Sequence, residues 1–141
     1  MTYLLDTSVW FRAVSHEDSL PSDIRRIIRR PSSQFGLSVF SLWEVGKKHQ
    51  IGKLKLAMSL EQWFDRALSA NISVLPLSSA IIGDATSLPN FPNSDPADEL
   101  ITATARIHHL TLMTTDRMLR KYKHAKVKYF KPLSPKNRWT N

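Results

Sequence analysis

Short apolar runs alternate along the chain with stretches that carry apolar residues at helical spacing. Five runs rich in apolar or β-branched residues predict β-strands, at residues 3–5, 35–39, 72–77, 110–114 and 127–130. Residues 60–68 repeat apolar positions at i, i+3 and i+4, and residues 100–107 are mostly apolar; both segments predict helices. Because strands and helices alternate along the sequence, we expect an α/β fold with a largely parallel sheet.

Composition places this pattern in one folded unit. The 141 residues are 42% hydrophobic and 23% charged, which is typical of a globular protein and sufficient for one core, so we expect a single domain over residues 1–141. The chain has no cysteine, which excludes disulfides, thiolate metal sites and cysteine nucleophiles. No apolar segment is long enough to span a bilayer and no leader pattern precedes Asp6, so we expect no membrane association and a cytoplasmic location.

The positive charge is concentrated at the C-terminal end. Residues 117–141 contain nine Lys and Arg and no acid, and because the whole chain carries +8, residues 1–116 sum to −1. A second basic cluster, within residues 25–30, has helical spacing. These clusters fit a polyanionic partner, and they fit simple solvation of a basic surface about equally well.

Aromatic residues are interleaved with the C-terminal lysines, as in proteins that bind single-stranded nucleic acid. They are Tyr122, Tyr129, Phe130 and Trp139. Residues 126–131 also fit a lysine-bearing strand at the edge of a sheet, where lysines oppose aggregation. The sequence leaves both interpretations open.

Four acidic residues follow predicted strands or begin predicted helices. They are Asp6, Glu44, Asp98 and Asp116. In parallel α/β sheets, ligand sites form beyond the carboxyl ends of the strands, so these four carboxylates are candidates for one site.

Each acid also has a local structural explanation. Residues 41–44 read as a capping box, with Ser41 as the N-cap of a helix and Glu44 at N3. Asp95 is predicted to cap the next helix, with Pro96 at its first position and Asp98 at N3. The other two acids fit caps or Asx-turns. Capping explains each acid singly, but it does not explain why all four share one edge.

If the carboxylates converge, their mutual repulsion favours a bound cation. Oxygen ligands without nearby histidine or cysteine suit Mg²⁺ or Mn²⁺, and such ions serve in phosphodiester hydrolysis. The chain carries no phosphate-binding glycine loop and no serine-nucleophile motif. Metal-assisted cleavage of a nucleic acid therefore joins the acidic residues to the basic segment.

The sequence resembles the PIN domain, specifically the VapC-type toxins, in the order and spacing of four motifs. The motifs lie at residues 3–8, at 41–45 with 52–54, at 95–98 before 100–105, and at 112–116. The resemblance runs from Tyr3 to about Tyr122. It implies a three-layer α/β/α sandwich around a mostly parallel five-stranded sheet. It also implies an Mg²⁺- or Mn²⁺-dependent endoribonuclease that acts as the toxin of a toxin–antitoxin pair, with RNA as substrate, a VapB-type antitoxin as partner and a homodimer as its usual state.

The resemblance also assigns roles to individual residues. Asp6, Glu44, Asp98 and Asp116 occupy the positions of the family's acidic quartet. Three of them, Asp6, Asp98 and Asp116, are expected to be the closest metal ligands, with Glu44 binding a second ion or positioning water. Ser8 and Thr114 fall where small hydroxyl residues support the site. Glu99 stands where the family commonly has arginine, but on a helix it points about 100° away from its neighbour.

A non-enzymatic hypothesis remains. The chain would then be a non-catalytic nucleic-acid-binding or protein-interaction module on the same fold, with the four acids acting as caps. Trp43, Trp63 and Phe64 fit either a groove for a partner helix or core packing, and their helical spacing favours the core.

Overall fold

The computed structural model describes residues 1–133, and in it five short strands form one sheet. They are β1 (Tyr3–Leu5), β2 (Phe35–Ser38), β3 (Ile72–Leu75), β4 (Thr111–Thr114) and β5 (Val127–Tyr129). The strand order is β3-β2-β1-β4-β5, and every neighbouring pair is parallel. The predicted α/β fold with a mostly parallel five-stranded sheet is therefore confirmed.

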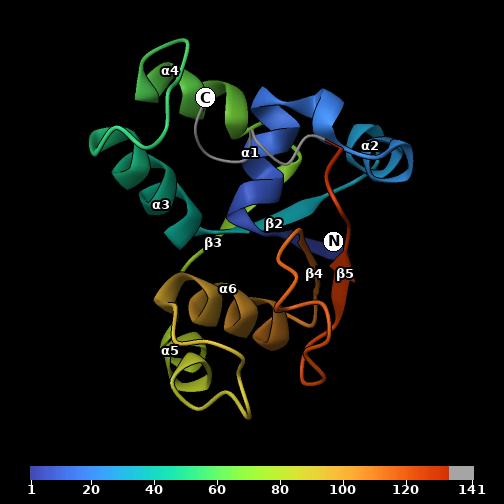
Figure 1. Cartoon of the computed structure of the whole chain (residues 1–141), viewed down its shortest axis with the longest axis vertical. Coiled ribbons are helices and arrows are strands. Elements are labelled where there is room, and N and C mark those ends of the chain that lie inside the picture. The colour runs from blue at the N-terminus through green and yellow to red at the C-terminus, as the bar shows by residue number, and fades with distance from the viewer. Residues whose placement is uncertain (134–141) are drawn as a thin grey trace.

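Helices cover both faces of this sheet. They are α1 (Thr7–Ser15), the short 3-10 helix η1 (Glu17–Ser19), α2 (Ser22–Arg29), α3 (Val39–Gln50), α4 (Leu60–Ala67), α5 (Ser79–Ala85) and α6 (Pro96–Ile107). Helices α1 to α4 lie on one side of the sheet, and α5 and α6 lie on the other (Figure 1). These three layers match the expected sandwich.

The alternation of side chains along the strands divides the core in two. Leu5 of β1 packs in the cluster that contains Trp10 of α1 and Trp63 of α4. Its neighbour Leu4 points the other way and packs with Ile101 of α6. Consecutive residues of β1 therefore attach both helical layers to the centre of the sheet.

The chain order makes β1 the centre of the molecule. The chain builds β1, β2 and β3 outward in one direction and then returns to place β4 on the other side of β1. Leu5 is thus aligned with Leu37 of β2 and with Met113 of β4. Ligand sites in open parallel sheets form at such a reversal of strand order, beyond the carboxyl ends of the strands.

Several predicted boundaries shift. Val39 was expected in a strand but begins α3, because Ser38 caps that helix. Helix α5 was not predicted; it is only 7 residues long, although Ser78 marks its N-cap.

Strand β5 lies at the edge of the sheet, as the lysine-bearing strand was expected to. Within residues 1–133, no helix has the length and apolar character needed to cross a membrane.

The last part of the predicted basic segment, residues 134–141 with Trp139, lies outside the described residues.

Candidate active site

A pocket of about 410 Å³ opens where β1 and β4 end. All four predicted acids line it, together with neighbouring polar and basic residues. The lining residues are Asp6, Thr7, Ser8, Glu44, Lys48, Asp95, Asp98, Thr115, Asp116 and Arg117. The structure therefore brings together carboxylates that lie as far apart in the sequence as residues 6 and 116.

Asp6 is held at the bottom of this group by two hydrogen bonds. It directly follows β1, where it caps α1 by accepting from the Thr7 N–H at 2.8 Å, and its second oxygen accepts from the Thr114 hydroxyl at 2.6 Å. Only 9% of Asp6 is exposed. Burial, with the charges of Glu44 and Asp116, raises the pKa of Asp6 to about 6, although the Thr114 hydrogen bond opposes the rise.

The predicted capping box at Ser41 and Glu44 is wrong. Helix α3 begins earlier in the chain, and Ser38 caps it by accepting from the Phe40 N–H at 3.1 Å. The buried Ser41 lies inside the first turn, where its hydroxyl is hydrogen-bonded to the Thr7 hydroxyl at 2.8 Å. The spacing of Ser41 and Glu44 matches a capping box, but Ser38 is an equally good cap and lies one turn earlier, so the sequence pattern gave the wrong start for α3.

Glu44 consequently has no capping role and turns to the pocket. Its carboxylate lies 4.0 Å from the Lys48 ammonium, one helical turn along α3. Burial raises the pKa of Glu44, the Asp95 charge adds to this rise, and the Thr7 hydroxyl and Lys48 oppose it.

Asp98 combines a helix-terminal position with a place in the pocket. The predicted cap is confirmed: Asp95 accepts from the Ala97 N–H at 2.9 Å, and Pro96 is the first residue of α6. Asp98 accepts from the Asn93 side chain at 3.0 Å. Burial first, and then the charges of Asp6 and Asp95, raise the pKa of Asp98 to about 7.

Asp116 stands in the turn that follows β4. Its N–H donates to the Thr114 hydroxyl at 3.0 Å, and its carboxylate accepts from the Met118 N–H at 2.8 Å, which is an Asx-turn. Beside it, the Ser8 and Thr115 hydroxyls are 3.2 Å apart. The two predicted hydroxyl residues, Ser8 and Thr114, therefore both lie at the group of acids.

The electrostatics of the pocket indicate an excess of negative charge. Three of the four acids have raised pKa values, and in each case another carboxylate contributes to the rise. A hard divalent cation is the chemical complement of such an oxygen-only set of ligands. Among residues 1–133, however, no three acidic or histidine side chains are arranged so that they could hold an ion in their present rotamers.

The model of one protein family, described as the PIN domain, matches residues 3–125. The chain belongs to the PIN domain family. It is similar to Ribonuclease VapC22 of Mycobacterium tuberculosis, with 27% identity over 123 residues that cover 87% of this chain and 93% of that protein.

Solved structures share the fold of this PIN domain at lower identity. VapBC2 from Rickettsia felis, bound to a DNA fragment from its promoter, has a chain with a TM-score of 0.69 and 17% identity, covering 92% of this chain and 98% of that one. A chain of DNA-bound VapBC from Salmonella typhimurium gives a TM-score of 0.69 and 16% identity over the same shares.

Other residues of this pocket were not singled out from the sequence. Asp95 was predicted only as a cap, yet it also lines the pocket and raises the pKa values of Glu44 and Asp98. Asn93 holds Asp98, and no spacing rule signals it because it lies in an irregular loop. Lys48 was recognisable, since it follows Glu44 by four residues on a helix.

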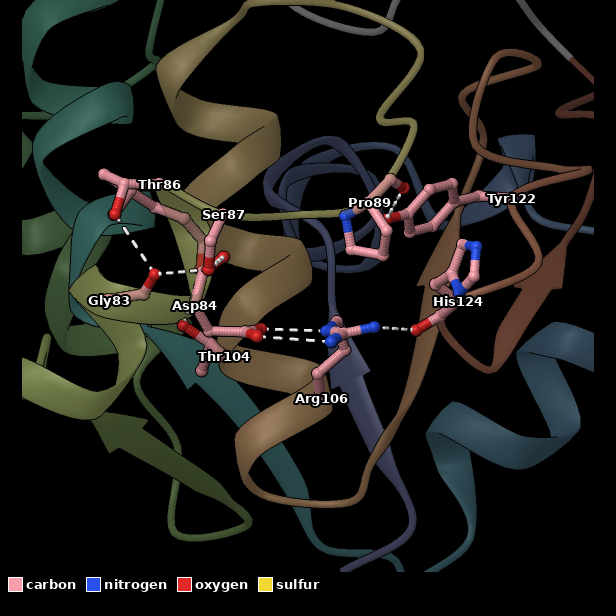
Figure 2. A network of polar contacts seen from close by, with 10 residues as sticks. Gly83, Asp84, Thr86, Ser87, Pro89, Thr104, Arg106, Tyr122 and His124 are labelled. Carbon is pink, nitrogen blue, oxygen red and sulfur yellow. Dashed lines mark hydrogen bonds and ion pairs between the residues drawn. The ribbon is translucent and has the colours of Figure 1, made fainter.

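The predicted aromatic residues take different roles. Tyr122 is buried and donates its hydroxyl hydrogen to the Pro89 carbonyl at 2.7 Å (Figure 2), and Phe130 is buried in the core, so the nucleic-acid interpretation is wrong for these two residues. Trp63 belongs to the core, as its spacing favoured, but Trp43 is 58% exposed.

Proposed function

We propose that this PIN domain is a metal-dependent endoribonuclease and the toxin of a toxin–antitoxin pair. The observation that carries the proposal is the convergence of four carboxylates in one pocket at the reversal of strand order. The similarity to Ribonuclease VapC22 and to chains of VapBC complexes supports the choice of RNA as substrate and of a VapB-type antitoxin as partner.

The residues that would hold Mg²⁺ or Mn²⁺ are Asp6, Glu44, Asp98 and Asp116. When bound, such an ion activates a water molecule and stabilises the charge that develops on the cleaved phosphodiester. Asp6 is already oriented by Thr7 and Thr114, so it loses little side-chain freedom on binding. Asp98 and Asp116 also line the pocket, and each uses one carboxylate oxygen in a hydrogen bond, Asp98 with the Asn93 side chain and Asp116 with the Met118 N–H.

The deciding experiment compares the wild-type protein with Asp98→Asn. Cleaved ends are mapped in total RNA with Mg²⁺, with Mn²⁺ and with EDTA. We expect cleavage by the wild type only with a metal ion, and a loss of at least about 100-fold in Asp98→Asn, because the variant removes a charged ligand. Glu99→Gln is the matched control, since it removes the adjacent carboxylate of α6, which does not line the pocket.

Equal cleavage by Asp98→Asn and the wild type would exclude this mechanism. If neither protein cleaves RNA and Mg²⁺ leaves the melting temperature unchanged, the non-catalytic module is the better explanation, because an ion stabilises only a folded state that binds it. The homodimer implied by the resemblance is measured separately by light scattering.

A further inference from the structure

A pocket of about 760 Å³ lies next to the four acids and is lined by basic residues. Its lining includes Thr115, Arg117, Arg120, Tyr129, Phe130 and Lys131. None of the described residues that line it is acidic. Its volume lies within the range of about 300–1,000 Å³ that ligand sites have. We call it the basic pocket.

We call the pocket of about 410 Å³ that the four acids line the carboxylate pocket. The basic pocket lies beside it because of the order of the strands in the sheet. Asp6 and Asp116 follow β1 and β4, while Lys131 follows β5, the edge strand beyond β4 (Figure 1). Thr115 and Arg117 line both pockets. The carboxyl edge of the sheet is thus acidic over its centre and basic at its β5 end.

An aromatic ring is built into the basic pocket. Tyr129 is partly exposed, and the Arg120 guanidinium lies 5.3 Å from the centre of its ring, in a cation–π arrangement. This arrangement places a positive charge over one face of a partly exposed ring. Proteins that bind single-stranded nucleic acid use basic side chains to contact the backbone and aromatic rings to stack with the bases.

We propose that the basic pocket binds the RNA strand immediately beside the point of cleavage. Arg120 and Lys131 contact the phosphate backbone, and one unpaired base stacks on Tyr129. The proposal rests on the proposed ribonuclease function, which places the strand in the adjoining carboxylate pocket. A base that stacks on Tyr129 must leave its own helix, so the enzyme selects unpaired RNA.

An acidic protein segment is the competing occupant. The RNA strand is favoured because the basic pocket shares Thr115 and Arg117 with the carboxylate pocket, and because a base can stack on the Tyr129 ring. Carboxylate groups of a peptide would use the cations but not the ring.

The test measures binding of a fluorescently labelled single-stranded oligouridylate, with Asp98→Asn as the parent so that the probe stays intact. The variant Arg120→Gln/Lys131→Gln is compared with Arg26→Gln/Arg30→Gln. The control pair removes the same charge from arginines of another basic pocket, on and just after α2.

We expect the first pair to raise the dissociation constant about tenfold and to reduce the salt slope by about 0.7 for each phosphate that is no longer neutralised. The control pair stays within about twofold of the parent. Tyr129→Leu should weaken binding about fivefold or more, while Tyr129→Phe keeps the ring and binds like the parent. If Tyr129→Leu fails to fold, the exposed Arg120 and Lys131 still decide the question.

Three results would overturn the proposal. The first is equal RNA binding by the two charge variants, and the second is that the parent binds a duplex of the same sequence as tightly as the single strand. The third is that Arg120→Gln/Lys131→Gln binds a glutamate-rich peptide more weakly than the parent but binds RNA equally well. Cleavage is assayed in parallel with Asp98 intact. Full cleavage by Arg120→Gln/Lys131→Gln refutes this pocket but leaves the nuclease in place. Loss of RNA binding in a chain that never cleaves supports the pocket and refutes the nuclease.

Discussion

At the scale of the residue, Asp6 and Asp98 show one design: each is fixed by a local hydrogen bond and crowded by other carboxylates. The N-cap of α1 and the pocket carboxylate are the same side chain, Asp6. The structural and functional interpretations of Asp6 are therefore compatible, and the choice between them that the sequence posed is a false one.

The raised pKa of Asp98 makes stability depend on pH. The pKa of Asp98 is 3.8 in the unfolded chain and about 7 in the folded chain. Between these two pH values the folded chain holds a proton that the unfolded chain has lost, so the free energy of unfolding falls as the pH rises. In EDTA we expect Asp98→Asn to lose less stability than the wild type between about pH 4 and pH 7, and to melt several degrees higher at about pH 8. Urea unfolding at each pH measures this, and an equally steep decline in the variant would contradict it.

Thr114 provides a test of orientation at constant charge. Its buried hydroxyl donates to Asp6 and accepts from the Asp116 N–H. Thr114→Val removes both hydrogen bonds at nearly constant volume, so we expect about 10- to 100-fold lower cleavage. Because the variant lacks a hydrogen bond that lowers the pKa of Asp6, the acidic limb of the pH–rate profile should move to higher pH.

Thr114→Ser is the matched control, because it keeps the hydroxyl. A pH–rate profile of Thr114→Val that superimposes on that of the wild type would show that Thr114 does not tune Asp6.

At the scale of the element, the apolar pattern predicted the strands and the packed helices, whereas the cap residues predicted the start of α6 correctly and the start of α3 wrongly. The five strand positions and the helices at residues 60–68 and 100–107 are confirmed within a few residues. The start of α3 was wrong because Ser38 and Ser41 are both good caps, and only tertiary contact with Thr7 engages the second. Helix α5 is too short to show a clear period.

Two glycines give a matched pair of stability tests. A Cβ at Gly36 of β2 would lie 3.0 Å from Leu75 and 3.1 Å from Leu110, whereas a Cβ at Gly83 of α5 meets nothing within 4 Å. We expect Gly36→Ala to cost about 1–3 kcal/mol through overpacking. Gly83→Ala should stabilise the protein by about 0.5–1 kcal/mol through helix propensity.

Both values follow from urea unfolding of the two variants beside the wild type. Full stability of Gly36→Ala would show that the side chains around β2 can move apart slightly at this point.

A polar link joins α5, α6 and the connection between β4 and β5. Arg106 of α6 is ion-paired with Asp84 of α5 at 2.8 Å and donates to the His124 carbonyl (Figure 2). We expect Arg106→Met to cost about 1 kcal/mol and to speed hydrogen exchange over residues 121–126. Asp84→Asn keeps the donor to His124, so it should leave that exchange closer to the wild type.

At the scale of the whole molecule, the site is a product of strand order. The sequence predicted that the acids stand at strand ends, and the sheet order explains why they meet, since β1 lies between β2 and β4. Sequence did not reveal the charge polarity of that edge, because Arg120 and Lys131 gather only when β5 is placed beside β4.

The same strand order sets when the molecule can work. Asp6 receives the hydroxyl of Thr114 across 108 positions of sequence, so a growing polypeptide on the ribosome has no assembled pocket until that late strand has emerged. At ordinary translation speeds this delay is about 5–20 s. The nascent chain therefore lacks the assembled carboxylate pocket during most of its synthesis.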